Sequence, residues 1–221
     1  MPEADRDFWE RAAPRYDRVA RGLLGRPLPR MVQLTADGVS GAGAVLEVAA
    51  GTGLLTAAIA PRVERVVATD YADNMLVVLR ERMKRAGISN VETARRDIYA
   101  LGYPPGSFDA VVAGNVLHLV PDLDGAVQAL CHVLRPGGTL IAPTYAHDET
   151  LRSKVLSRLF AAFMVMHRRF TAGSLRDALG RHGVRIARSE TIPGPIPVAY
   201  VEGVVSGGLV TPPSAADHAT D

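Results

Sequence analysis

The 221-residue sequence contains one cysteine, Cys131, and no apolar run long enough to cross a membrane as a helix. A single cysteine excludes an intramolecular disulfide and suits a reducing compartment, where the thiol serves as a small core residue. The first residues, MPEADRDFWERAAPRYDR, lack the apolar centre of a secretory signal. We therefore expect a cytoplasmic protein.

Charge of one sign is also lacking, because the formal net charge is only +2. Binding nucleic acid through its phosphates needs a concentrated basic surface, and the chain has no basic patch interleaved with aromatic residues. Histidine, cysteine and carboxylate residues do not recur at metal-ligand spacing, and there is no serine nucleophile elbow. The sequence thus predicts no nucleic-acid partner and no metal site.

Basic residues do gather in two segments, at 7–24 and around 149–167. Each segment is interpreted as the solvated face of an amphipathic helix or as a surface that contacts an anionic membrane, and the solvated face is favoured. The residues concerned are Arg11, Arg15, Arg18, Arg21, Arg152, Lys154, Arg158, Arg168 and Arg169.

Short apolar runs alternate with helical patterns along most of the chain. This alternation favours right-handed crossovers and a parallel sheet covered on both faces. The last two strands are joined by a Pro-Gly-Pro turn without room for a helix, so we expect them to be antiparallel. The predicted strands are 44–48, 65–70, 90–94, 108–116, 139–145, 184–192 and 196–205, and the predicted helices are 7–24, 54–60, 73–86, 122–134, 149–167 and 173–182.

The stretch VLEVAAGTG, residues 45–53, predicts a strand that runs into a glycine-rich turn. Gly51 and Gly53 let the backbone approach a ligand, and the following helix offers free N–H groups. Ligands of open α/β sheets bind beyond the carboxyl ends of the strands, where this turn is expected. The dinucleotide fingerprint needs a third glycine or alanine where this chain has Thr56, which disfavours a nicotinamide-dependent oxidoreductase.

Two carboxylates follow neighbouring strands at the same edge of the expected sheet. Asp70 ends the second strand and can accept both hydroxyls of a ribose, or else it caps the helix at 73–86. Asp97 follows the third strand and can accept a hydrogen bond from an adenine amino group. The pair favours an adenosine-containing cofactor.

Four stretches in this order resemble the successive motifs of the class I S-adenosylmethionine-dependent methyltransferases of the small type 11 kind: VLEVAAGTG, ATDYADNM, RRDIYALGYPPGSFDAVVAGNVLHLV and VLRPGGTLIAPTYA. The resemblance runs from about Phe8 to Val205. It implies a Rossmann-like three-layer α/β/α sandwich whose seven-stranded, mostly parallel sheet has the order 3-2-1-4-5-7-6 and an antiparallel last strand. It also implies S-adenosylmethionine as cofactor and S-adenosylhomocysteine as product.

The resemblance implies a single methyltransferase domain over residues 1–205. An N-terminal helical lid would span 1–40, and an inserted helix at 148–170 would lie near the acceptor site. Residues 206–221, rich in Pro, Ala and Asp, are expected to form a disordered tail.

The methionine end of the cofactor would be held by the glycine-rich turn. By resemblance, Glu47, Gly51 and Gly53 bind this end, and Asn115 lies near the amino-acid part. The family usually has glycine where this chain has Ala49. The Ala49 methyl group is therefore expected to narrow the pocket.

The adenosine end would lie against the next two motifs. By resemblance, Asp70 binds the ribose and Tyr71 and Met75 flank the adenine. Asp97 accepts a hydrogen bond from the adenine amino group, and Ile98 supplies a backbone N–H to the ring.

The acceptor is expected beyond the fourth and fifth strands, near His118, Tyr145 and His147. His118 is the first choice for a general base because imidazole titrates near neutral pH, and the alternative is a packed residue at the start of a helix. Tyr16 and Trp9 would fold over the cofactor, or else they pack a leading helix.

The apolar stripe of the segment 149–167 forms either core or a pocket for an apolar acceptor, with His167 or Arg168 as a polar contact. Its members are Leu156, Leu159, Phe160, Phe163 and Met164. The predicted function is methyl transfer to a small, hydrophobic molecule. The alternatives are a lipid or quinone methyltransferase that docks on membranes, and a non-methylating enzyme that uses the same cofactor.

Overall fold

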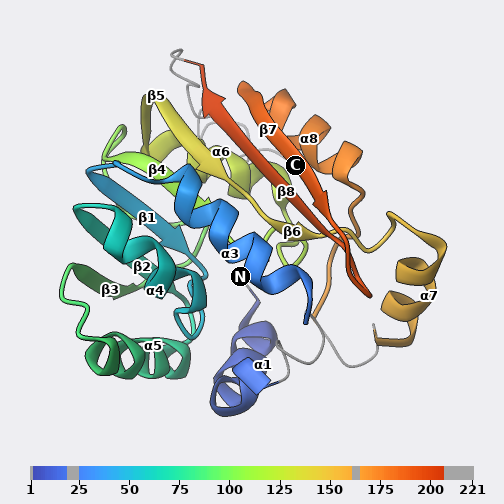
Figure 1. Cartoon of the computed structure of the whole chain (residues 1–221), viewed down its shortest axis with the longest axis horizontal. Coiled ribbons are helices and arrows are strands. Elements are labelled where there is room, and N and C mark those ends of the chain that lie inside the picture. Colours follow the sequence, from blue (N-terminus) through green and yellow to red (C-terminus); the bar gives the residue numbers. More distant parts are fainter. Residues whose placement is uncertain (1, 19–24, 161–164, 207–221) are drawn as a thin grey trace, which may run out of the picture.

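Eight strands form one sheet in the computed structural model, which describes residues 2–18, 25–160 and 165–206 (Figure 1). The strands are β1 (Ala44–Val48), β2 (Arg65–Asp70), β3 (Val91–Arg95), β4 (Phe108–Ala113), β5 (Leu134–Ile141), β6 (Thr144–Tyr145), β7 (Val184–Ile192) and β8 (Val198–Val205). The α-helices are α1 (Glu3–Ala12), α3 (Pro27–Gly38), α4 (Leu54–Ile59), α5 (Asp73–Ala86), α6 (Leu123–Val133), α7 (Leu151–Phe160) and α8 (Ala172–Arg181). Two short 3-10 helices, η1 (Ala13–Arg15) and η2 (Ala60–Arg62), follow α1 and α4.

The strand order is β3-β2-β1-β4-β5-β8, with β7 on the outer side of β8. Strands β1 to β5 are parallel, and β8 runs antiparallel to both β5 and β7. The predicted order 3-2-1-4-5-7-6 is therefore confirmed. The expected strand 139–145 is interrupted at Ala142 and Pro143, and its last two residues continue along β8 as β6.

Helices cover both faces of the sheet, which confirms the three-layer sandwich. Successive residues of β1 alternate between two hydrophobic cores. Leu46 lies in the first core with residues of α6 and α8, and Val45 lies in the second core with residues of α3, α4 and α5. Both faces are apolar because a parallel sheet with helices on each side is buried on both.

Several predicted boundaries hold, and others were wrong. The strands 44–48 and 65–70 and the helix 73–86 have the predicted limits. The strand predicted for 108–116 ends at Ala113, since Asn115 has a φ of +53° and leaves the extended conformation. The helix predicted for 149–167 ends at Phe160, and residues 165–167 are not helical. Positions 161–164, with two members of the predicted stripe, lie outside the described residues.

The N-terminal segment divides into two parts with different places in the fold. Helix α1 and η1 occupy the first part of the predicted helix 7–24, while residues 19–24 lie outside the described residues, as do residues 207–221 of the expected tail. Helix α3 belongs to the sandwich, because Met31 and Leu34 are buried in the second core. Within the described ranges, no helix has the length and apolar character needed to cross a membrane.

Candidate functional site

The turn after β1 is held in a left-handed backbone conformation at both predicted glycines. Gly53 has a φ of +80° and precedes α4, and a Cβ at this position would lie 2.8 Å from Cγ of Leu79 in α5. Gly51 has a φ of +56°, and a Cβ there would meet nothing within 4 Å. Gly53 is thus required by helix packing, whereas Gly51 keeps open the side of the turn that a ligand approaches.

Ala49, the residue where the family usually has glycine, is also left-handed, with a φ of +50°. In this conformation the Cβ of an L-residue crowds the neighbouring carbonyl, at a cost of roughly 1–2 kcal/mol. The turn therefore adopts the backbone that glycine favours and carries a side chain as well.

Asp70, at the end of β2, binds the turn through its carboxylate. Oδ2 accepts a hydrogen bond from the N–H of Gly51 at 2.8 Å, and Oδ1 accepts one from the N–H of Ala72 at 2.9 Å. Burial raises the pKa of Asp70 to about 6 despite these bonds. The bond to Ala72, directly before α5, supports the capping role, and the remaining lone pairs of the carboxylate leave room for ribose hydroxyls.

Glu47 lies beneath the turn. Its Oε2 accepts a hydrogen bond from Thr56 Oγ1 at 2.6 Å, and its side chain is buried. Burial raises the pKa of Glu47 to about 8. Thr56, which replaces the third small residue of the dinucleotide fingerprint, therefore has a structural partner in the strand below.

A small cavity of about 50 Å³ opens beside this turn. It brings together the predicted residues Tyr16, Ala49, Gly51, Asp70, Tyr71, Met75 and Asn115. Trp9 also lines it, and so do three residues that were not predicted: Gly114, Val116 and Leu119. The predicted residues Glu47, Gly53, Asp97 and Ile98 do not line it. Since small-molecule pockets are usually some 300–1,000 Å³, a nucleoside-sized ligand needs the surrounding side chains to move.

Asp97 and Ile98, the predicted adenine-binding residues, do not line the cavity. The Asp97 carboxylate accepts a hydrogen bond from the N–H of Tyr99 at 3.0 Å, and Ile98 is buried in the first core. The pKa of Tyr71 is raised chiefly by burial and also by the charges of Asp5, Asp70 and Asp97. Asp97 thus lies near enough to Tyr71 for its charge to act on the phenol.

Trp9 and Tyr16 cover the cavity from the N-terminal segment, with their ring centroids 5.9 Å apart. Burial, followed by the charges of Asp70 and Asp17, raises the pKa of Tyr16 to about 12. The neighbouring Asp17 accepts a hydrogen bond from Thr52 Oγ1 at 2.5 Å and is paired with Arg82. These contacts fasten the segment to the glycine-rich turn.

A second set of bonds fastens the same segment to α5. The Glu10 carboxylate accepts hydrogen bonds from the N–H groups of Asp73 and Asn74, at 2.7 and 2.8 Å. Glu10 thus caps a helix that begins 63 residues later. Neither Glu10 nor Asp17 was predicted, because nothing in the local sequence indicates a partner so far along the chain.

Two polar atoms at the cavity are buried and have no hydrogen-bond partner among the described residues: Asn115 Oδ1 and Tyr71 OH. The backbone of Asn115 is fixed by a 2.7 Å hydrogen bond from its N–H to the carbonyl of Pro143. An amide oxygen at this place suits the ammonium of an amino acid, and the Asp70 carboxylate suits vicinal hydroxyls. The residues present therefore fit S-adenosylmethionine.

The three predicted catalytic residues come together in one cluster, in which His118 and His147 are buried and Tyr145 is partly buried. The ring centroids of His118 and Tyr145 are 5.4 Å apart, those of His118 and His147 5.3 Å, and those of Tyr145 and His147 5.6 Å. His147 Nδ1 is hydrogen-bonded to Ser157 Oγ of α7 at 2.8 Å. Ser157 was missed, since a serine within an amphipathic helix carries no chemical signal until its partner is known.

Three polar atoms of this region are buried without a partner among the described residues: His118 Nδ1, His147 Nε2 and Thr144 Oγ1. Unpaired buried polar atoms are costly, so their retention indicates a use outside the packing of the chain. The cluster adjoins the cavity, because Val116 and Leu119 on either side of His118 line the cavity wall.

Burial determines the protonation of the cluster. It lowers the pKa of His118 well below its usual value and that of His147 to about 4, while it raises the pKa of Tyr145. Both imidazoles are therefore neutral at neutral pH and are weaker bases than free imidazole. In the folded chain His118 therefore differs from the free imidazole on which its prediction as general base depended.

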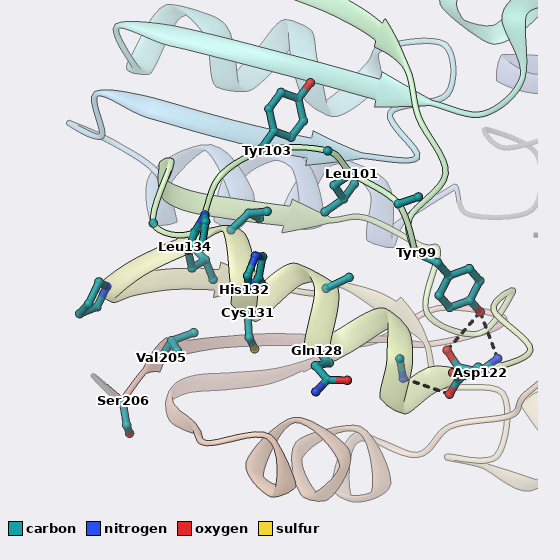
Figure 2. Close-up of a pocket in the computed structure, with 18 residues that line it drawn as sticks. Tyr99, Leu101, Tyr103, Asp122, Gln128, Cys131, His132, Leu134, Val205 and Ser206 are labelled. Carbon is teal, nitrogen blue, oxygen red and sulfur yellow. Dashed lines mark hydrogen bonds between the residues drawn. The ribbon is translucent and has the colours of Figure 1, made fainter. Parts of the chain in front are cut away.

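A larger cavity, of about 1,050 Å³, lies along α6 and shares no lining residue with the small cavity (Figure 2). Its walls include Leu101, Tyr103, Cys131 and Val205. Figure 2 shows the Tyr99 hydroxyl at one end, bonded to the backbone of Asp122. None of the predicted site residues lines this cavity, and the Tyr99 hydroxyl and the Asp122 backbone already bind each other. We therefore do not assign the active site to it.

The fold and the site together define a class I methyltransferase architecture, and comparison with known proteins agrees. Residues 45–138 match a family described as "Methyltransferase domain". The chain is 30% identical over 163 residues to the ubiquinone/menaquinone biosynthesis C-methyltransferase UbiE of Pseudomonas putida, covering 71% of this chain and 62% of that protein. The chain thus spans less than two thirds of the length of this relative. It is also 35% identical over 109 residues to an uncharacterized chloroplastic methyltransferase of Arabidopsis thaliana, covering 47% of this chain and 31% of that protein.

Solved structures show the same fold. The N-methyltransferase NodS from Bradyrhizobium japonicum, in complex with S-adenosylhomocysteine, superimposes with a TM-score of 0.65 at 18% identity, over 80% of this chain and 85% of that one. The [4+2]-cyclase SpnF gives a TM-score of 0.67 at 18% identity, over 81% of each chain. Residues 45–138 thus form a methyltransferase domain of the class I S-adenosylmethionine-dependent kind.

Proposed function

We propose that this protein transfers a methyl group from S-adenosylmethionine to a small, hydrophobic acceptor bound against the cluster of His118, Tyr145 and His147. The observation that carries the proposal is the set of unpartnered buried atoms, Asn115 Oδ1 on the cofactor side and His118 Nδ1 and His147 Nε2 on the acceptor side. They lie in apolar surroundings next to one cavity, as expected of a site that orients an apolar molecule through few polar contacts.

In this proposal the cofactor supplies an already activated methyl group, and the chain supplies binding, orientation and exclusion of water. Asp70 binds the ribose hydroxyls, and Asn115 accepts a hydrogen bond from the ammonium group. Tyr71 and Met75 line the adenine side, and Asp97 and Ile98 would contact the adenine once the surrounding side chains have moved. The segment carrying Trp9 and Tyr16 acts as a lid that must open for entry and closes over the bound molecule.

The neutral histidines orient the acceptor. An unprotonated ring nitrogen accepts a hydrogen bond from a hydroxyl or N–H group, and the protonated Tyr145 can donate one. An acceptor hydroxyl would thus be held with its proton directed at His118 or His147. Ser157 fixes the ring of His147 for this task through its bond to Nδ1.

A second candidate acceptor is a quinone precursor methylated at carbon. Relatives named as ubiquinone/menaquinone biosynthesis C-methyltransferases favour it, including one from Enterobacter sp. that is 36% identical over 136 residues. A quinone precursor is an apolar molecule, which agrees with the apolar walls at Val116 and Leu119. The free, buried thiol of Cys131 agrees with a protein that functions in the reducing cytoplasm.

The proposal is tested by calorimetric titration with S-adenosylmethionine and S-adenosylhomocysteine, with NAD as control, followed by methyl transfer from labelled cofactor to apolar phenols and quinols. We expect both sulfur compounds to bind and NAD not to bind. Asp70→Asn should weaken binding of both, while the exposed Asp177→Ala of α8 should not. Conversion of an acceptor without methylation would indicate a non-methylating enzyme, and binding of NAD alone would contradict the cofactor assignment.

A further inference from the structure

Helix α7 turns its polar face inward and its apolar face outward. Ser153 and Ser157 are 0% and 2% exposed, whereas Leu151, Val155 and Leu159 are 79%, 51% and 66% exposed. The three apolar residues follow one another at intervals of four and form a single stripe along the helix. A helix that packs on a protein core and faces water has the opposite arrangement.

The inward serines have partners within the protein. Ser157 binds His147 of the acceptor cluster, and Ser153 binds Thr150 at the start of the helix through bonds of 2.9–3.0 Å. The inner face of α7 thus belongs to the site. The outer stripe contributes nothing to either core, since none of its residues is buried in them.

Basic side chains border the stripe on both sides. At 100° per residue, Arg152 projects from one side of it and Lys154 and Arg158 from the other. All three are exposed, and the helix contains no acidic residue. Figure 1 shows α7 at the periphery of the molecule, beyond the end of β6 and outside the layers of the sandwich.

We propose that α7 is a docking surface for an anionic lipid bilayer. Leu151, Val155 and Leu159 would enter the interface between headgroups and acyl chains, and the three cations would lie at the level of the phosphates. Charge distinguishes this occupant from a second copy of the chain, because a two-fold contact through α7 would bring its cations against each other.

The docking surface extends the proposed function without depending on the identity of the acceptor. With α7 on the membrane, its inner face directs Ser157 and His147 away from the lipid and toward the cofactor cavity. If the acceptor is apolar as proposed, it can pass from the bilayer into the site along this helix.

The test is co-flotation of the whole chain with vesicles, at low and at high salt. Vesicles of equimolar phosphatidylcholine and phosphatidylglycerol should carry the protein, and vesicles of phosphatidylcholine alone should not. High salt should reduce the binding, because it screens the basic groups. A protein that floats with neither kind of vesicle at low salt would overturn the proposal.

Variants locate the surface. The combined change Leu151→Ser, Val155→Ser and Leu159→Ser should weaken vesicle binding roughly tenfold or more, and so should Arg152→Gln, Lys154→Gln and Arg158→Gln. The matched control is Val77→Ser in α5, which replaces an apolar residue of 51% exposure elsewhere on the surface and should leave binding unchanged. An equal loss in the control would refute the assignment to α7.

Two further readouts separate this proposal from others. Sedimentation in the absence of lipid should show a monomer, and a dimer abolished by the triple serine variant would instead make the stripe a self-contact. Cofactor titration of the same variants should match that of the unaltered chain. Loss of vesicle binding with intact cofactor binding therefore tests docking alone, whereas absence of cofactor binding in every variant would count against the proposed function.

Discussion

Replacing Ala49 by glycine should stabilise this protein. Ala49 holds a φ of +50°, a conformation that costs an L-residue roughly 1–2 kcal/mol and costs glycine nothing comparable. Glycine gains conformational freedom in the unfolded chain, which removes about 0.5–1 kcal/mol of that benefit. At the middle of both ranges, the net stabilisation is about 0.75 kcal/mol.

Thermal unfolding of the ligand-free protein measures this effect. For a chain of this length, 1 kcal/mol shifts Tm by about 2–4 °C, so Ala49→Gly should raise Tm by about 1–4 °C. The matched control is Ala50→Gly, at a neighbouring residue that is 8% exposed, packs in the second core and has no left-handed φ. There glycine removes a buried methyl group without relieving strain, and Tm should fall.

The same substitution has a second readout, because Ala49 lines the small cavity. Removal of its Cβ widens the site where the methionine end of the cofactor is expected. Titration calorimetry should thus show tighter binding of S-adenosylhomocysteine by Ala49→Gly. The reasoning would be refuted if Ala49→Gly lowered Tm as far as Ala50→Gly does.

Three further predictions follow from individual contacts. Burial raises the pKa of Glu47 from 4.5 to about 8, so between these pH values the folded chain retains a proton that the unfolded chain releases. The free energy of unfolding should therefore fall by about 1.4 kcal/mol per pH unit as pH rises through this range. Denaturant unfolding at several pH values should show a shallower fall for Glu47→Gln, and an unchanged slope would contradict the raised pKa. Ser157→Ala should lower kcat roughly tenfold with unchanged cofactor affinity, because His147 Nδ1 loses its partner. Ser153→Ala, on the same helix face, should leave kcat unchanged. An equal loss of kcat in both variants would indicate a general effect on α7. Glu10→Ala removes the cap on α5 and should loosen the N-terminal segment that carries Trp9 and Tyr16. The fluorescence emission of Trp9, the single tryptophan, should then shift to the red, whereas Glu3→Ala, at an exposed position of α1, should leave it unchanged. No shift in Glu10→Ala would mean that Glu10 does not hold this segment in place.

Local pattern determined most of the fold. The apolar runs at β1 and β2, and the helix at 73–86 that ends at Gly87, were predicted with the limits observed. Their signals act over a few residues, through hydrophobic periodicity and a glycine that adopts the left-handed conformation after a helix. The order of the strands followed from the family resemblance.

The site was predicted in part. The residues that line the cavity from Ala49 to Asn115 come from motifs at the carboxyl ends of β1, β2 and β4, where the topology brings them together. Glu47 was also named, but the structure directs it to Thr56 in the core beneath the turn. Which side of the strand faces the ligand depends on the register of the sheet and on the helix above it.

The sequence by itself determined the alternation of strands and helices and the glycine-rich turn, because each depends on residues close together in the chain. Only the tertiary structure decided that Glu10 caps α5, that burial keeps His118 neutral and that α7 faces outward with its leucines. These depend on partners far along the chain and on burial. An amphipathic pattern shows that a helix has two faces, but only the packing of the whole chain determines which face lies inside.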